Sequence, residues 1–139
     1  MSKIAKFDLP KILPHIGKPC SPPWILNFQG QGYPIPVSSS KMKLMKKTQI
    51  CACCGLQGTF FDLEIRGNNN PHLNLYGVGP RNSHVMLTVD HIVPRSKGGT
   101  RDMSNVQLLC ARCNNQKGNK IITIEELRRR ISPKIEKEL

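Results

Sequence analysis

Hydrophobic and polar residues alternate along two stretches in the middle of the chain. In residues 61–66 every second position is apolar, and residues 72–78 repeat this pattern after a Gly- and Asn-rich loop at 67–71. Alternation with a period of two is typical of a β-strand with one buried face. Turn residues at 79–82 then lead into the apolar segment 83–89. These patterns predict a strand followed by a β-hairpin.

The C-terminal third of the chain predicts two helices. The apolar residues within 106–109 favour a helix that continues through Cys113. A second helix over about 123–131 begins with the capping box Thr123-Ile-Glu-Glu126 and continues with apolar residues at helical spacing. Ser132-Pro133 is expected to end or bend this helix, because the residue before a proline disfavours the helical conformation.

Residues 1–47 differ in composition from the rest of the chain. They contain 7 of the 11 prolines and eight lysines but a single acidic residue, and they show no apolar period long enough to predict an element. We therefore expect an extended basic arm, which either remains a partly disordered tail or becomes ordered on the domain or on nucleic acid. The sequence divides into a basic Pro-rich arm at 1–47, a compact unit at 48–120 and a C-terminal helical extension at 121–139.

The charge of the chain points to a polyanionic partner. The chain has 21 Lys and Arg against 9 Asp and Glu, a formal net charge of +12. Such a field favours nucleic acid or an anionic membrane surface. No stretch approaches the ~20 apolar residues that span a bilayer, and prolines and lysines interrupt residues 1–20, where a secretory signal would lie. We therefore expect a cytoplasmic protein of one domain that binds nucleic acid and no membrane.

Six cysteines in a reducing compartment are expected to be metal ligands or free thiols rather than disulfides. Four of them form two Cys-x-x-Cys pairs, Cys51 with Cys54 and Cys110 with Cys113. Two residues between thiolates let a tight turn aim both sulfurs at one ion, and two such turns complete the tetrahedral coordination that suits Zn²⁺. A redox pair would need a thioredoxin-like βαβ context that the sequence lacks. The remaining cysteines are assigned no ligand role: Cys20 and Cys53.

Polar residues at characteristic positions surround the second cysteine pair. In chain order they are Asp90-His91 at the end of an apolar segment, Gly98-Gly99, Asn105 before the pair, Asn114 directly after it, and Lys117-Gly118. This pattern resembles the HNH nuclease family over residues 51–54 and about 87–120. The resemblance implies the ββα-metal finger as the fold. We therefore expect an α+β protein in which a four-cysteine zinc site holds this finger together, between the basic arm and the C-terminal helix.

The same residues have the chemistry that phosphodiester hydrolysis requires. His91 suits the general base, since a neutral imidazole accepts a proton from water at physiological pH. Asp90 and Asn114 present oxygen atoms to a hard catalytic cation such as Mg²⁺ or Mn²⁺. By resemblance, Asn105 positions the His91 loop. Many family members have a histidine where this chain has Asn114, so we expect a stronger dependence on Mg²⁺ or Mn²⁺. Asn115 is the adjacent alternative ligand.

These observations favour a metal-dependent HNH endonuclease that acts on DNA, with a structural zinc ion and one catalytic divalent ion. The alternative is a non-catalytic zinc-ribbon protein that binds nucleic acid, because a basic chain serves either function through counterion release. The Asp-His pair with its asparagines distinguishes the two, because a binding module needs no acid–base group beside oxygen ligands. A redox dithiol protein is a third class, for which we would expect reactive thiols. His72 and His84 are expected to be surface or structural residues, with His72 a weaker candidate beside the phosphate.

Overall fold

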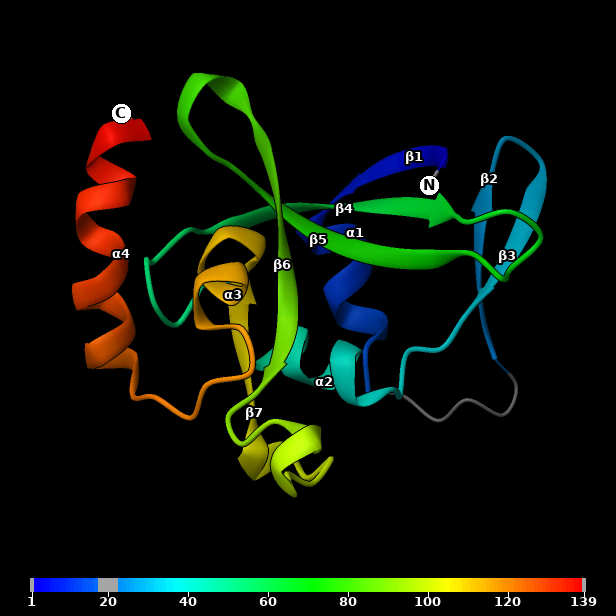
Figure 1. Cartoon of the computed structure of the whole chain (residues 1–139). Helices are drawn as coiled ribbons and strands as arrows, with labels where there is room; N and C mark the ends of the chain where they lie inside the picture. Colours follow the sequence, from blue (N-terminus) through cyan, green and yellow to red (C-terminus); the bar gives the residue numbers. More distant parts are fainter. Residues whose placement is uncertain (1, 18–22, 139) are drawn as a thin grey trace.

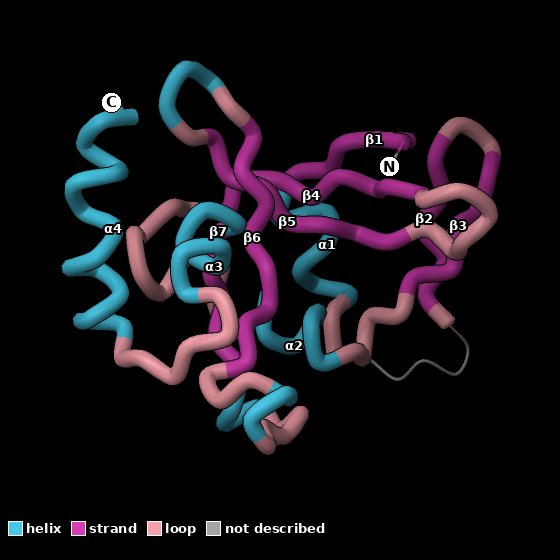
Figure 2. Tube along the Cα trace, in the orientation of Figure 1, coloured by secondary structure: helices cyan, strands magenta, loops and turns pink. Residues whose placement is uncertain are grey.

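The main sheet of the protein is antiparallel. The computed structural model describes residues 2–17 and 23–138, with side chains as far as residue 131. The strands lie in the order β1 (Ser2–Asp8), β4 (Gly58–Ile65), β5 (His72–Val78), β6 (His84–His91) and β7 (Val106–Cys110). β6 pairs with β5 through residues 84–86 and with β7 through residues 87–91. It therefore joins the two parts of the sheet (Figures 1 and 2).

Short helices and a second hairpin surround this sheet. The α-helices of the described residues are α1 (Leu9–Ile12), α2 (Ser40–Lys47), α3 (Ala111–Lys117) and α4 (Ile124–Glu138). The hairpin strands are β2 (Trp24–Phe28) and β3 (Gln31–Ile35), and 3₁₀ turns lie at Leu13–His15, Pro80–Asn82, Arg95–Lys97 and Met103–Asn105. α3 packs against β6 and β7, and α4 packs against α3 (Figure 1). Among the described residues no helix has the length and apolar character needed to cross a membrane.

The strands predicted from alternating residues are present as β4, β5 and β6. The polar side chains of β4 are nevertheless buried, because neighbouring elements cover them. Asp62 is 5% exposed and Glu64 is 7% exposed. Tyr76 Oη and Asn74 Nδ2 donate hydrogen bonds to Glu64 Oε1 at 2.7 and 2.9 Å, and Lys41 Nζ donates to Asn74 Oδ1 at 2.6 Å. This polar network ties α2 to the sheet.

Composition predicted an extended arm for residues 1–47, and the alternative in which this arm becomes ordered on the domain agrees with the structure. The described part of the segment nevertheless forms regular elements, which the sequence did not predict. β1 pairs with β4 in antiparallel register, with Phe7 opposite Phe61. Ile12, Leu26 and Met45 are fully buried in the same core as the rest of the sheet. The sequence predicted no elements in this segment because each element is too short to show a periodicity, and because its burial depends on residues distant in the sequence.

Residues 106–110 form the strand β7. The prediction that a helix begins in this segment is therefore wrong. Leu108 and Leu109 point to opposite faces of the strand, and both are fully buried. A strand buried on both faces has no period of two, so spacing alone does not separate it from a helix. The helix α3 begins only at Ala111. The second cysteine pair therefore spans the junction between β7 and α3.

The predicted C-terminal helix is present and begins as its capping box indicates. Thr123 Oγ1 accepts a hydrogen bond from the backbone N–H of Glu126 at 3.1 Å. Leu127 and Ile131 are buried at helical spacing. Of the two alternatives predicted at Ser132-Pro133, an end or a bend, the end is wrong, because α4 continues to Glu138. A proline removes one backbone hydrogen bond from a helix, and here that loss does not end a helix whose first turns are already packed.

Candidate functional site

β6, β7 and α3 form a ββα unit on which both candidate sites are built. β6 and β7 are antiparallel neighbours, and α3 follows β7 directly and packs on both strands. The first cysteine pair lies in the loop before β4. A hydrogen bond from Ala52 N to Leu108 O, at 2.8 Å, attaches this loop to β7. Segments more than fifty residues apart in sequence are thereby held together.

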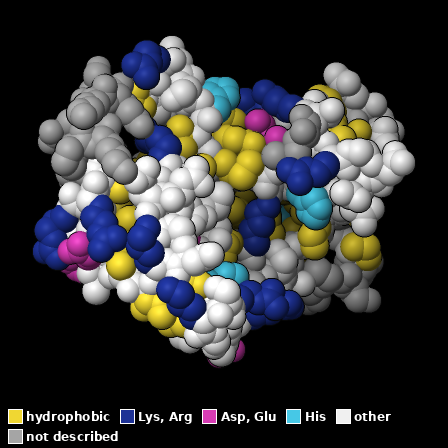
Figure 3. All heavy atoms as spheres, viewed as in Figure 1, with side chains coloured by type: hydrophobic (Ala, Val, Ile, Leu, Met, Phe, Trp, Pro, Cys, Tyr) yellow, Lys and Arg dark blue, Asp and Glu magenta, His cyan; other side chains and the backbone are white. Residues whose placement is uncertain are grey.

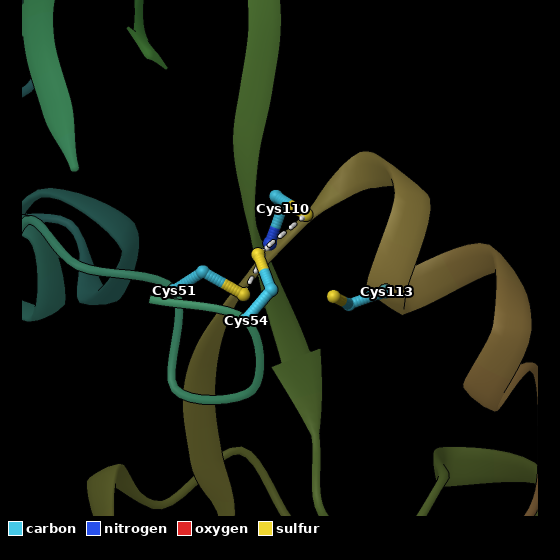
Figure 4. Close-up of side chains that lie close together, drawn as sticks. All are labelled: Cys51, Cys54, Cys110 and Cys113. Carbon is cyan, nitrogen blue, oxygen red and sulfur yellow. Dashed lines mark hydrogen bonds between the residues drawn. The ribbon is translucent and has the colours of Figure 1, made fainter. Parts of the chain in front are cut away.

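The four cysteines of the two pairs converge on one point (Figure 4). The sulfur atoms of Cys51, Cys54, Cys110 and Cys113 all lie within 4.8 Å of one another. Cys54 Sγ and Cys110 Sγ are 3.7 Å apart, and a tetrahedral Zn²⁺ with bonds of about 2.3 Å to sulfur places its ligands about 3.8 Å apart. The cluster is therefore compatible with the structural zinc site that the spacing predicted.

The four thiols of this cluster shift one another's pKa values. Hydrogen bonding to Cys113 lowers the pKa of Cys110 to about 6, and hydrogen bonding to Cys110 lowers the pKa of Cys51. The pKa values of Cys54 and Cys113 are raised, in each case mainly by hydrogen bonding with Cys110. Four sulfurs at these distances cannot all be thiolates without a cation between them, because like charges oppose ionisation. A bound dication removes this conflict, and the thiolate is the form that binds zinc.

Arg128 of α4 holds the loop of the first cysteine pair. Its Nε donates a hydrogen bond to Cys53 O at 2.8 Å, and its Nη2 donates to Ala52 O at 2.9 Å. Cys53 itself is buried, lies outside the group of four converging sulfurs, and has a pKa raised by burial. Cys20 lies outside the described residues.

A surface hollow of about 310 Å³ lies at the end of β6 and is lined by Asp90, His91 and Asn114. Asp90 and His91 are the last two residues of β6, and Asn114 lies in the middle of α3. Asn105 and Asn115 are not among the described residues that line it. The structure thus brings together three of the four predicted site residues around one space.

Asn114 has a defined orientation in this hollow. Thr88 Oγ1 donates its single hydrogen to Leu109 O at 2.9 Å, so it can only accept a hydrogen bond from Asn114, whose Nδ2 lies 2.8 Å away. The carbonyl oxygen Oδ1 of Asn114 accepts no hydrogen bond from the described residues, so it can contact a group in the hollow. An amide oxygen is a ligand that hard cations accept.

Asp90 is held by two partners that the sequence analysis did not assign. Gln107 Nε2 donates to Asp90 Oδ2 at 3.0 Å, and Lys117 Nζ lies 3.2 Å from Oδ2 and 3.4 Å from Oδ1. Lys117 Nζ also donates to His91 O at 3.1 Å. Lys117 shares a helix face with Asn114, three residues earlier, which is a signal that could have identified it. Gln107 faces Asp90 only because of the β6–β7 register.

Asn105 lies behind the hollow and holds the loop that follows His91. Its Oδ1 accepts from Val93 N at 2.9 Å, and its Nδ2 donates to Val93 O at 3.1 Å and to Thr100 O at 2.8 Å. Gly99 is required in this loop, because a Cβ atom there would lie 1.7 Å from Val93 O. The loop is therefore pinned at both of its ends.

The remaining histidines lie in other parts of the molecule. His72 lines a separate hollow with prolines of the β2–β3 region, including Pro34 and Pro36. His84 contacts the ring of Phe60 edge-on, with the ring centroids 5.1 Å apart. Neither histidine lines the hollow of Asp90.

Comparison with known proteins agrees with this arrangement. Residues 79–120 match the family model described as HNH endonuclease. The match spans β6, β7, α3 and the second cysteine pair, so the resemblance inferred from the sequence is confirmed, and the α+β fold is consistent with the ββα-metal type. Residues 79–120 are thus similar to an HNH domain, which indicates a nuclease or nucleic-acid-binding function. No curated protein and no solved structure matches the chain.

Proposed function

We propose that this protein is a metal-dependent HNH endonuclease that hydrolyses phosphodiester bonds in DNA. The observation that carries the proposal is the hollow, where an imidazole, a carboxylate and an amide meet within the residues that match the HNH family. Hydrolysis of a phosphodiester needs an activated water and stabilisation of the charge that builds on the phosphate oxygens. These three side chains have the chemistry for both tasks.

His91 is assigned the role of general base. Its imidazole is partly exposed in the hollow, where water and a phosphate have access to it. A neutral imidazole accepts a proton from the attacking water. Asn105 is assigned a positioning role, because its hydrogen bonds hold the loop that follows His91 and do not reach the hollow.

Asp90 and Asn114 are assigned to the catalytic divalent cation. The donor set fits, because both side chains line the hollow and both present oxygen, which Mg²⁺ and Mn²⁺ prefer. When bound, such an ion stabilises negative charge on the phosphate oxygens. Thr88 orients the amide of Asn114, while Gln107 and Lys117 orient the carboxylate of Asp90.

The charge of the protein supports DNA as the substrate. The net charge of the chain is +12. Three of its basic residues are exposed in the loop after His91: Arg95, Lys97 and Arg101. Figure 3 shows Lys and Arg side chains spread over the face drawn there, whereas Asp and Glu form only small groups. A surface of this kind neutralises phosphates and releases their counterions.

The decisive experiment compares cleavage of supercoiled plasmid by the purified protein and by His91→Ala, with Mg²⁺ present or chelated. We expect nicked or linear product only from the unmodified protein with Mg²⁺. His72→Ala is the matched control, because it removes a histidine that lies outside the hollow, and it should cleave normally. Plasmid that stays intact under all conditions, with zinc and DNA binding retained, would instead support the non-catalytic zinc-ribbon alternative.

A further inference from the structure

Lys117 is completely buried although its side chain carries a charge. Its Nζ lies between the carboxylate of Asp90, at 3.2 and 3.4 Å, and the carbonyl oxygen of His91, at 3.1 Å. An ammonium group without access to water requires partners of this kind. Lys117 therefore neutralises Asp90 from inside the protein, on the side away from solvent.

The two oxygens of Asp90 are not equivalent. Oδ2 accepts from Gln107 at 3.0 Å and has the shorter contact with Lys117, at 3.2 Å. Oδ1 has only the longer contact with Lys117, at 3.4 Å, among the hydrogen bonds of the described side chains. Oδ1 is therefore the oxygen available to a group in the hollow. Its carboxylate, however, is already paired with a positive charge.

The other charges beside the hollow do not restore a negative potential. Asp90 is the only acidic residue among the described residues that line it, and Arg95 adds a positive charge. With His91 neutral, Asp90, Lys117 and Arg95 together have a net charge of +1. A site with this charge attracts a phosphate and gives a free dication no electrostatic reason to bind.

We propose that the nucleic acid completes the divalent-cation site of this protein: Lys117 neutralises Asp90, so the hollow binds Mg²⁺ or Mn²⁺ tightly only when a substrate phosphate lies in it. The inference rests on the proposed function, because it takes Asp90 and Asn114 as cation ligands. A phosphodiester supplies the missing negative charge and further oxygen ligands, and Mg²⁺ commonly takes substrate phosphate oxygens as ligands. By linkage, the cation must then strengthen DNA binding by the same factor.

The test is a titration of Mn²⁺ into the zinc-loaded full chain carrying His91→Ala, with free Mn²⁺ measured by electron paramagnetic resonance. A short duplex of mixed sequence is present or absent at low salt. Without DNA we expect a dissociation constant of about 1 mM or weaker. With DNA we expect Mn²⁺ to bind at least about tenfold more tightly, which corresponds to about 1.4 kcal/mol of coupling free energy. The double variant His91→Ala, Asn114→Ala corrects for Mn²⁺ held by the DNA itself.

Variants at Lys117 test the cause of this coupling in the same titration. Lys117→Met, made with His91→Ala, removes the charge and keeps the length, so Mn²⁺ should bind the free protein about tenfold more tightly. Lys117→Arg retains the charge and should preserve weak binding without DNA. Zinc content and thermal melting report whether each variant folds. If Lys117→Met does not fold, the titration with lysine in place still decides the proposal.

Two results would overturn the proposal: micromolar Mn²⁺ binding without DNA, or an Mn²⁺ affinity that DNA does not change. A Lys117→Met variant that folds and still shows the full effect of DNA would contradict the role of Lys117. Failure of the proposed function is distinguishable from these outcomes. Plasmid cleavage with DNA-independent Mn²⁺ binding leaves the endonuclease function intact, whereas coupled binding without plasmid cleavage removes only the endonuclease function.

Discussion

The four-cysteine cluster and the hollow lie on the same ββα unit, yet they suit metal ions in opposite ways. The cluster is a closed site, because four converging sulfurs complete a tetrahedral shell without help from solvent. The hollow is proposed as an open site, because Asp90 and Asn114 would supply few ligands and would leave room for water and phosphate. A closed site stabilises the fold, and an open site leaves coordination positions for a substrate. The difference follows from the number of protein ligands and from their access to solvent.

The two sites are nevertheless joined through α3. Cys113 and Asn114 are consecutive residues of this helix, and a turn of 3.6 residues directs consecutive side chains to different sides. Cys113 therefore reaches the cluster while Asn114 reaches the hollow. The cluster fixes the start of α3, and through α3 it also fixes the position of Asn114.

Cys110→Ser tests the closed site and should have the largest effect. We expect the variant to lose zinc and to unfold, because metal binding and folding are coupled and a structural zinc contributes about 10 kcal/mol or more. Elemental analysis should find about one zinc per chain in the unmodified protein, and circular dichroism reports the fold. Cys53→Ser is the matched control and should keep both zinc and fold. A zinc-free protein that remains folded would show that the cluster is not a structural metal site.

Asn114→Ala tests the open site. We expect plasmid cleavage to fall about 100-fold, since the proposed cation loses one of its oxygen ligands and with it part of the charge stabilisation in the reaction. Zinc content and the melting temperature should stay close to those of the unmodified protein, because Asn114 is not a ligand of the cluster. Asn115→Ala is the control, since Asn115 is exposed and does not line the hollow. Equal losses in both variants would point to a ligand other than Asn114.

Asn105→Ala tests whether the open site depends on the loop behind it. The variant loses three hydrogen bonds to the backbone of Val93 and Thr100. We expect the free energy of unfolding to fall by about 2 kcal/mol, measured by urea denaturation, together with a loss of cleavage. Asn105→Asp keeps the acceptor for Val93 N, so its stability and its cleavage should lie between those of the unmodified protein and of Asn105→Ala. Unchanged cleavage in a less stable Asn105→Ala protein would make the residue purely structural.

Arg128→Ala tests the support of the closed site. The guanidinium donates to two carbonyl groups of the first cysteine loop, so we expect a loss of about 1–2 kcal/mol in stability. Zinc should pass to a chromogenic chelator faster than from the unmodified protein. Arg130→Ala is the control, because Arg130 pairs with Glu126 on the exposed side of α4. Equal chelation rates in the two variants would mean that Arg128 does not support the cluster.

Asp62 lies outside both sites, so Asp62→Asn should have the smallest effect of these variants on stability. Burial raises the pKa of Asp62 above its ordinary value, against the opposite effect of Lys3. The folded state then binds more protons than the unfolded state just above the ordinary pKa, so stability falls as the pH rises through that window. We expect Asp62→Asn to gain less than about 1 kcal/mol at about pH 7 and nothing at about pH 3, measured by urea denaturation. A loss of stability at neutral pH would mean that the contact with Lys3 outweighs burial.

The cysteines of the zinc cluster could be proposed from their local spacing, whereas the residues of the hollow were proposed from the resemblance to the HNH family. Two residues between cysteines define a turn that aims two sulfurs at one ion, and the four cysteines do converge. The capping box of α4 and the alternating residues of β4 are local in the same sense, and both elements are present. Short-range chain geometry therefore predicted the zinc cluster and the firmest elements.

The structure of the N-terminal segment could not be predicted from composition and local spacing. Its lysines indicated a basic arm for phosphates, but Lys41 contacts Asn74 and Lys3 lies 3.9 Å from Asp62. The strand β1 is an edge of the main sheet, so removing residues 1–47 would remove part of the core. A shorter chain would therefore change stability as well as charge. Composition describes which groups a segment carries, and only packing decides which of them remain free.

The sequence by itself determined the two cysteine pairs, because each pair depends on residue type and local spacing, and its resemblance to the HNH family indicated the class of domain and the candidate residues of the hollow. The tertiary structure decided which partners hold them. Gln107 meets Asp90 only through the register of β6 and β7, and Lys117 reaches the same carboxylate only because α3 packs across both strands. The charge that the hollow presents depends on this pairing. Strand register and helix packing are set by the burial of apolar residues distant in the chain, so no local pattern reveals them.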